Sequence, residues 1–223
     1  TADISELEKK YVNEVLDSGR LSYGPFLKSF EQKFAKMHES KFAIAVNSGT
    51  DALRIAIACL KESENWHEED EIICPAVTFI ATSNMILENG LKPVFVDVDP
   101  KIYNLDSRKI EVKITKKTRA IMVVHLFGMP CEMDRIMEIA RRYNLKVIED
   151  SCETMFARYN GKYVGSFGDF GCFSTYACHI IVTGVGGIVT TNNDKYAVIA
   201  KSLMNHGRDS IYLKIDDDKN KSE

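Results

Sequence analysis

The chain has 223 residues, 45% of them hydrophobic, which suits one domain with a substantial core. Its 29 Lys and Arg residues against 32 Asp and Glu residues give a net charge of −3 with no basic stripe, and this balance argues against a nucleic-acid-binding protein. The longest apolar runs, such as residues 120–124, are strand-sized and too short to cross a membrane.

In chain order, residues 1–10 (TADISELEKK) indicate the exposed start of a helix rather than a signal peptide. Short runs rich in β-branched side chains predict strands, at residues 41–46, 71–74, 92–98, 119–124, 146–149, 171–175 and 187–191. Apolar residues at helical spacing predict helices, at residues 50–61, 79–89, 133–143 and 194–204. This alternation indicates an α/β fold with a mostly parallel sheet covered by helices on both faces.

The predicted organisation is one domain over residues 1–215, including the N-terminal helical segment. Residues 216–223 (DDDKNKSE) contain no apolar side chain and predict a polar tail or an interrupted loop. Parallel sheets bind their ligands beyond the carboxyl ends of the strands. The candidate site residues are therefore those that directly follow a strand.

The cysteines lie in or beside apolar stretches, at Cys59, Cys74, Cys131, Cys152, Cys172 and Cys178. None of them forms a C-x-x-C pair or stands at zinc-like spacing from a histidine, so no metal site is predicted. We expect small buried side chains in a reducing compartment, and hence a cytoplasmic protein.

Residues 47–53 (NSGTDAL) connect a predicted strand to a predicted helix. Small residues there leave backbone N–H groups open at a helix N-terminus, which favours an anion, and the hydroxyls of Ser48 and Thr50 add donors. The pattern suits a phosphate group. It equally suits an ordinary helix cap and turn.

Two further segments follow strands. Phe79, within residues 78–82 (TFIAT), could stack on a flat ring or belong to the core. Residues 147–150 (VIED) place the carboxylates of Glu149 and Asp150 where the ligand crevice is expected. A carboxylate close to a ring nitrogen would keep that nitrogen protonated, although the same residues could cap a helix.

Residues 165–187 (GSFGDFGCFSTYACHIIVTGVGG) form a glycine-rich approach to a strand. Their glycine spacing and context are not those of a dinucleotide-binding fingerprint. Ser174 in this segment is a further possible phosphate donor.

The order and spacing of these blocks are more specific than any one of them. The chain resembles the DegT/DnrJ/EryC1/StrS family of sugar aminotransferases and dehydratases from about residue 21 to residue 208. The resemblance rests on the blocks GPFLKSFEQKFAK, AVNSGTDAL, PAVTFIATSNMILENGLKPVFVDVD, VHLFGMPCEMDRIMEIARRYNLKVIEDSCE, GSFGDFGCFSTY and NHGRD. It implies the fold type I architecture of pyridoxal-phosphate enzymes, here the large domain without the small C-terminal domain, in a homodimer.

The resemblance also implies a role for each matching residue. Gly49, Thr50 and the backbone at Asp51 would cradle the cofactor phosphate, with the hydroxyl of Ser174 as a further donor. Phe79 would stack on the pyridine ring, and Asp150 would pair with the ring nitrogen. Glu153 would face the ring oxygen, where the family's aminotransferases usually have glutamine; a carboxylate there would repel a phenolate unless one of the two is protonated.

One position departs sharply from the aminotransferase pattern. His179 stands where those enzymes carry the lysine that forms a Schiff base with the cofactor, and Val185 stands where they carry a glutamate. Histidine cannot form that bond, but its ordinary pKa of about 6.5 lets it act as a base near neutral pH. Pyridoxal or pyridoxamine phosphate would therefore be held non-covalently.

A branch of the family, the nucleotide-sugar 3-dehydratases, also carries histidine there. By that resemblance, pyridoxamine phosphate would act on a nucleotide-linked 4-keto sugar, His179 would remove a proton, and the C3 hydroxyl would leave to give a 3-deoxy sugar. Two alternatives stay open. The chain could be an atypical sugar aminotransferase with glutamate as amino donor, or a truncated domain that has lost catalysis.

Three other residues near these motifs are further candidates for the site. Cys178 adjoins His179, but neighbours in an extended segment point to opposite faces, so no Cys–His dyad is expected. His125 follows a predicted strand and could line the crevice or be structural. Arg208 could bind a substrate phosphate or carboxylate.

Overall fold

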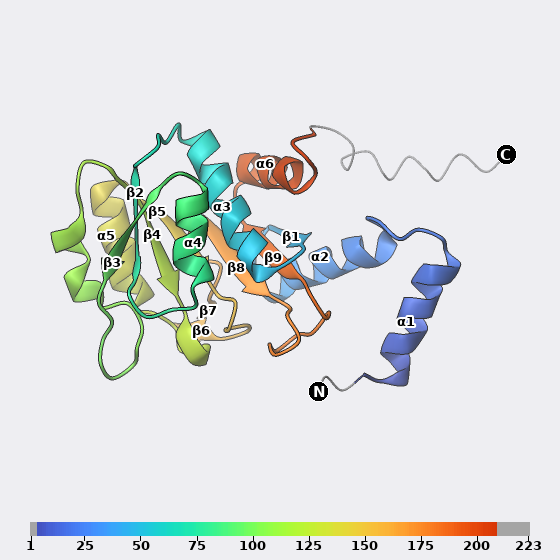
Figure 1. The fold of residues 1–223 in the computed structure, drawn as a ribbon. Helices are drawn as coiled ribbons and strands as arrows, with labels where there is room; N and C mark the ends of the chain where they lie inside the picture. The colour runs from blue at the N-terminus through green and yellow to red at the C-terminus, as the bar shows by residue number, and fades with distance from the viewer. Residues whose placement is uncertain (1–3, 209–223) are drawn as a thin grey trace.

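The structure is a computed structural model and describes residues 4–208. Its centre is a 7-stranded sheet in the order β1-β9-β8-β5-β4-β2-β3 (Figure 1). The strands are β1 (Phe42–Val46), β2 (Glu71–Pro75), β3 (Lys92–Val96), β4 (Thr118–Val124), β5 (Lys146–Asp150), β8 (Phe170–Ser174) and β9 (Gly187–Thr191). The pairs from β3 through β2, β4 and β5 to β8 are parallel, and β9 runs antiparallel to both β8 and β1. The prediction of a mostly parallel sheet is confirmed.

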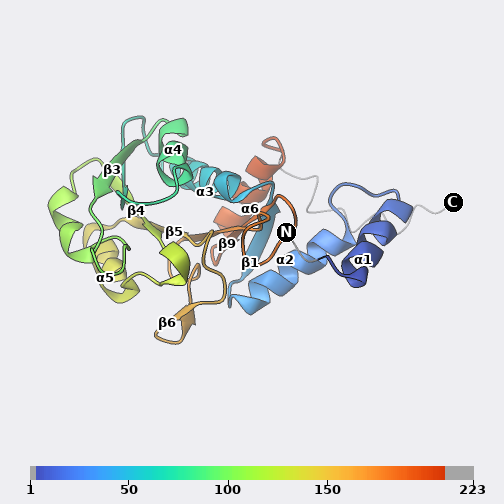
Figure 2. The ribbon, with the colours of Figure 1, turned by 60° about the horizontal axis from the view of Figure 1, so that its bottom comes forward.

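The predicted helices are present as α3 (Gly49–Ser63), α4 (Ala81–Glu88), α5 (Met133–Tyr143) and α6 (Asp194–Met204). Alternate residues of the strands pack on opposite sides of the sheet. Ile72 and Met122 join the core under α3, α4 and α6, whereas Ile73 and Ile121 join the core under α5. The helices therefore cover both faces, as predicted (Figures 1 and 2).

Two helices precede the sheet. α1 (Glu6–Asp17) begins where the sequence predicted a helix start, with Ser5 and Glu8 forming a capping box. α2 (Pro25–Met37) was not predicted; it begins at a proline and buries Phe34 and Ala35. α1 buries no residue, and both views show it lying away from the sheet (Figures 1 and 2).

The remaining elements are short and escaped prediction. They are the 3-10 helices η1 (Ser107–Lys109), η2 (Glu111–Lys113) and η3 (Leu126–Gly128), and the two-stranded pair β6 (Arg158–Tyr159) and β7 (Lys162–Tyr163). No helix between residues 4 and 208 is long and apolar enough to span a membrane. The predicted domain end at residue 215 and the tail at residues 216–223 lie outside the described residues.

Candidate active site

A cavity of about 360 Å³ lies beyond the carboxyl ends of β1, β2, β4, β5 and β8, within the usual size range of small-molecule sites. Of the residues predicted to hold or act on the cofactor, all except Asp51 line it, whereas the further candidates Glu149, His125 and Arg208 do not. The lining residues are Ser48, Gly49, Thr50, Leu53, Thr78, Phe79, Ala81, Val124, Leu126, Asp150, Cys152, Glu153, Ser174, Tyr176, Cys178, His179, Val185 and Gly186. A wider hollow of about 720 Å³ over the ends of α3 and α4 contains none of the predicted residues.

The N-terminus of α3 opens on this cavity. The hydroxyl of Ser48 caps the helix and accepts a 3.0 Å hydrogen bond from the backbone N–H of Asp51. The Asp51 carboxylate lies 2.5 Å from the guanidinium of Arg54. Both polar groups of Asp51 thus have partners within the helix, and the structure does not bring Asp51 to the cavity with Gly49 and Thr50.

Gly49 lets α3 approach the end of β8 closely. A Cβ atom added at Gly49 would lie 2.7 Å from Cβ of Ser174 and 2.8 Å from Sγ of Cys152. Only glycine therefore allows the open N–H end of the helix and the Ser174 hydroxyl to meet at one wall. Ser174 is buried, and its Oγ accepts a 3.3 Å bond from the N–H of Tyr176.

Asp150 ends β5 with its side chain buried at the cavity. It accepts hydrogen bonds from Oγ1 of Thr82 at 2.9 Å and from the N–H of Cys152 at 3.2 Å. Burial raises the pKa of Asp150, while its bonds to Cys152 and Thr82 and the nearby His125 oppose that rise. A positively charged partner at the cavity would favour the ionised carboxylate.

Phe79 is not part of the core. Its side chain is 66% exposed and lies on the cavity just before α4, which begins at Ala81 rather than at residue 79. An exposed aromatic ring beside a cavity offers a surface on which a flat ring can stack.

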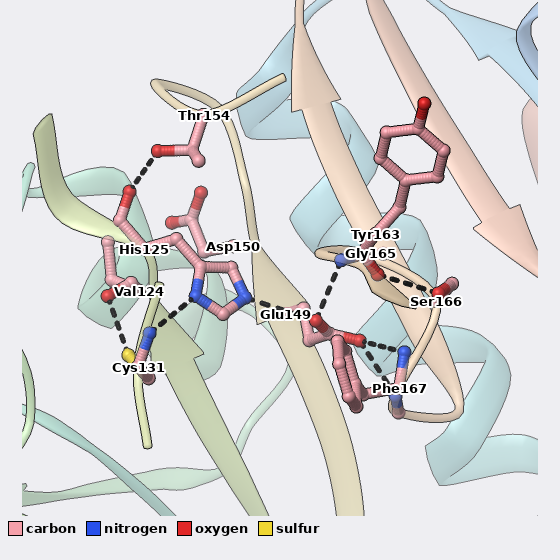
Figure 3. A network of polar contacts seen from close by, with 12 residues as sticks. Val124, His125, Cys131, Glu149, Asp150, Thr154, Tyr163, Gly165, Ser166 and Phe167 are labelled. Atoms are coloured by element: carbon pink, nitrogen blue, oxygen red, sulfur yellow. Dashed lines mark hydrogen bonds and ion pairs between the residues drawn. The ribbon is translucent and has the colours of Figure 1, made fainter. Parts of the chain in front are cut away.

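The prediction that both carboxylates of residues 147–150 face the crevice is wrong for Glu149. Successive side chains of a strand point to opposite faces, so Glu149 lies buried on the far side from Asp150. Its carboxylate accepts hydrogen bonds from the backbone N–H groups of Gly165, Phe167 and Gly168 (Figure 3). The backbone N–H groups of the glycine-rich segment therefore bind the Glu149 carboxylate rather than a ligand.

His125 is completely buried and does not line the cavity, which favours its structural reading. Its Nε2 lies 3.0 Å from Oε2 of Glu149, and the N–H of Cys131 points at its Nδ1 at 3.1 Å (Figure 3). Burial lowers the pKa of His125, but the side chains of Cys131 and Glu149 raise it, with a net upward direction. In either charge state a proton on Nε2 faces the Glu149 carboxylate.

His179 lies in the loop between β8 and β9. Its backbone N–H donates a 2.9 Å bond to the carbonyl of Tyr176, which closes a turn, and its ring meets that of Tyr176 edge-on with 6.2 Å between centroids. The Nδ1 atom of His179 is buried and has no hydrogen-bond partner. Among the described residues, no lysine lines the cavity.

The extended conformation predicted around Cys178 and His179 is wrong, because the chain turns there and both residues line the cavity. Cys178 is exposed, unlike the buried side chain that was expected. Arg208 is exposed and does not line the cavity.

Glu153 also lines the cavity. Its Oε2 accepts a 3.3 Å bond from the N–H of Phe127, a residue with a left-handed backbone (φ 53°). The acidic group to which the resemblance assigns a place near the ring oxygen is thus held at the cavity by the η3 segment.

Sequence reasoning missed several lining residues, among them Cys152 and Tyr176, and the partner of Asp150, Thr82. Thr82 belongs to a segment that the sequence did single out, but no spacing rule connects it to Asp150. Together the open end of α3, the Ser174 hydroxyl, the Asp150 carboxylate and the Phe79 ring fit a flat, phosphorylated ring with a basic nitrogen. The ring of His179 lies at the same cavity, so a histidine is placed beside such a ligand.

The chain was compared with known proteins. The model of the DegT/DnrJ/EryC1/StrS aminotransferase family matches residues 2–219. GDP-perosamine synthase of Caulobacter vibrioides is 45% identical over 203 residues, 91% of this chain and 54% of that protein. The dTDP-3-amino-3,6-dideoxy-alpha-D-galactopyranose transaminase of Aneurinibacillus thermoaerophilus is 41% identical over 94% of this chain and 59% of that protein.

Solved structures agree with this picture. An aminotransferase from Psychrobacter cryohalolentis superposes with a TM-score of 0.90 at 36% identity, covering 95% of this chain and 53% of that one. The E. coli GDP-4-keto-6-deoxy-D-mannose-3-dehydratase with bound hydrated pyridoxal phosphate superposes with a TM-score of 0.85 at 35% identity, covering 92% and 52%. The chain spans about half the length of the curated relatives that it matches.

Proposed function

The chain belongs to the DegT/DnrJ/EryC1/StrS aminotransferase family, and from this premise we propose that it is the cofactor-binding part of a nucleotide-sugar 3-dehydratase. The substrate class is a nucleotide-linked 4-keto sugar, and the product is the corresponding 3-deoxy sugar. The observation that carries the proposal is His179, which lies on the cavity with an unpartnered buried nitrogen while no lysine lines that cavity among residues 4–208.

The cavity offers a group for each part of pyridoxal or pyridoxamine phosphate. The N-terminus of α3 at Gly49 and Thr50, with the hydroxyl of Ser174, would hold the phosphate. Asp150 would pair with the ring nitrogen, and Phe79 would cover the ring face. When bound, this cofactor supplies an amino group and an electron-accepting ring.

His179 would act as the base. As a residue type, histidine titrates near neutral pH, so its ring can take a proton and return it within one cycle. Since a histidine cannot tether the cofactor covalently, the non-covalent contacts described above would carry the whole of its binding. Glu153 at the cavity would favour a protonated oxygen on the ring beside it.

Several comparisons support this assignment. One similar structure is the GDP-4-keto-6-deoxymannose-3-dehydratase with a trapped PLP-glutamate geminal diamine. Another is a variant of that dehydratase, with a histidine replaced by asparagine, which has GDP-perosamine bound. Amino transfer is the second candidate, because GDP-perosamine synthases are among the similar curated proteins.

We also propose that the protein is a cytoplasmic homodimer. Analytical ultracentrifugation would measure the mass of the assembly.

Product analysis separates the two candidates. The full-length protein is incubated with pyridoxal phosphate, glutamate and a GDP-linked 4-keto-6-deoxy sugar, and the products are identified by mass and NMR. A 3-deoxy sugar is expected, and an amino sugar would overturn the dehydratase assignment in favour of the aminotransferase. His179→Asn should abolish product formation while changing cofactor affinity by less than about threefold, since His179 is not one of the proposed binding groups. Cofactor binding without any turnover would support the non-catalytic alternative.

A further inference from the structure

The carboxylate of Glu149 is buried and saturated with hydrogen bonds. Oε1 accepts the N–H groups of Phe167 and Gly168, each at 2.7 Å, and Oε2 accepts the N–H of Gly165 at 2.7 Å. Oε2 also lies 3.0 Å from Nε2 of His125. Glu149 is completely buried and does not line the cavity, so its carboxylate interacts only with other groups of the protein.

The turn that encloses Glu149 can form only with glycine at fixed places. Gly165 has a left-handed backbone (φ +78°), and a Cβ there would lie 2.2 Å from Cζ of Phe173. A Cβ at Gly168 would lie 2.5 Å from the carbonyl oxygen of Val147. The glycines therefore bring the turn flat against β5, where its N–H groups converge on one anion.

His125 extends this network to the end of β4. Its backbone N–H donates a 3.0 Å bond to the carbonyl of Asp150, and its own carbonyl accepts a bond from Oγ1 of Thr154. The same Thr154 oxygen accepts the N–H of Gly128 at 3.0 Å. The chain that leaves β4 is thus tied to the chain that leaves β5.

This hydrogen-bond network connects to two residues that line the cavity, Asp150 and Ser174. Asp150 follows Glu149 directly and lies on the cavity side of β5. The turn that holds Glu149 leads into β8, whose last residue is Ser174. We propose that Glu149, together with His125, is a positioning residue that fastens β4, β5 and the glycine-rich turn to one another and so fixes Asp150 relative to Ser174. The inference rests on the proposed function, because it concerns how the two ends of the cofactor are held.

The test replaces Glu149 by glutamine in the full-length protein. The amide group keeps the shape of the side chain but puts an N–H₂ where two donors converge, so the turn must loosen. The matched control is Glu31→Gln, the same change at another buried carboxylate, which accepts bonds from Tyr23 and Ala45 and does not line the cavity. Both variants are measured for pyridoxal phosphate affinity, for the induced circular dichroism of the bound cofactor, and for amide hydrogen exchange.

Glu149→Gln is expected to weaken cofactor affinity by about tenfold or more, to change the induced circular dichroism, and to speed exchange at Gly165, Phe167 and Gly168. Glu31→Gln should leave affinity and dichroism unchanged, whatever its effect on the unfolding temperature. Equal affinity and an unchanged spectrum in Glu149→Gln would overturn the positioning role. An equal loss of affinity in both variants would do so too, because it would reveal a general loss of stability.

If Glu149→Gln does not fold, His125→Gln provides the same measurement while leaving the three backbone donors on Glu149. A shift in affinity and dichroism is expected, and their constancy would overturn the proposal. If the unaltered protein does not bind pyridoxal phosphate at all, the proposed function fails. The exchange rates of the turn still report whether Glu149 holds it.

Discussion

The hydroxyl of Thr82 donates a 2.9 Å hydrogen bond to Oδ2 of Asp150, joining the first turn of α4 to the end of β5. Both side chains are buried, and Thr82 also shares a 2.8 Å hydrogen bond with Thr78. The contact joins two segments that the sequence singled out separately. It stabilises a carboxylate that burial would otherwise drive towards its neutral form.

Asp150→Asn should stabilise the cofactor-free protein at neutral pH while weakening cofactor binding. Burial raises the pKa of Asp150 in the folded state. A raised pKa contributes stability below the unfolded-state pKa, and this contribution is lost as pH rises through the folded-state value. At pH 7 the ionised carboxylate of the wild type therefore lowers the free energy of unfolding, and the neutral amide of asparagine does not. We expect the Tm to rise by a few degrees at pH 7, with a smaller difference at lower pH, and a Tm below that of the wild type at pH 7 would contradict this reading.

Thr82→Val should lower stability by about 1–3 kcal/mol at neutral pH, because it removes a donor from a buried carboxylate without changing the size of the side chain. Denaturant unfolding measures the loss. Thr82→Ser keeps the hydroxyl and should restore most of it. In an Asp150→Asn background the cost of Thr82→Val should shrink, and full additivity of the two changes would show that the hydrogen bond carries little energy.

His179→Lys should gain a covalent link to the cofactor that, on the proposed function, the wild-type protein does not form. A lysine at this position on the cavity can form a Schiff base with pyridoxal phosphate, which borohydride then fixes. Intact-mass measurement should show the added cofactor in His179→Lys and none in the wild type or in His179→Asn. Labelling of the wild type would mean that a lysine reaches the cavity, and the non-covalent proposal would then be wrong.

His38 should make the protein less stable as pH falls from about 6.5 to about 4. Its ring is fully buried among Phe34, Phe156, Tyr163 and Phe173, with no partner for either nitrogen. Burial lowers the pKa of His38 from 6.5 to about 4. The unfolded chain therefore takes up a proton before the folded protein does, and stability present above pH 6.5 is lost across this window. The loss attributable to His38 is about 3 kcal/mol.

His38→Phe keeps a ring in the cluster and should flatten this part of the pH profile measured by urea unfolding. The control is His67→Gln, because His67 is exposed and its replacement should leave the profile unchanged. If His38→Phe shows the same acid loss as the wild type, the buried ring is not its source.

Much of the fold followed from local pattern. The near-continuous apolar runs of β2 and β4 predicted strands buried on both faces, and α5 and α6 were predicted with the observed bounds. α2 was not predicted. Its buried residues are Glu31, Phe34 and Ala35, and the packing that buries them is against residues distant in the sequence. β6 and β7 are two residues each, too short for any periodicity.

The sequence by itself singled out the candidate site residues: the small residues around Gly49, the carboxylate of Asp150, the hydroxyl of Ser174, and His179 where the aminotransferases that it resembles carry a lysine. Only the tertiary structure decided which of them meet at one cavity. The packing of Gly49 against Ser174, which leaves no room for a Cβ atom, joins distant segments, and the alternation of β5 sends Glu149 inward and Asp150 to the cavity. Local pattern is governed by neighbours in the chain, whereas a site is governed by which strand ends the packed sheet brings together.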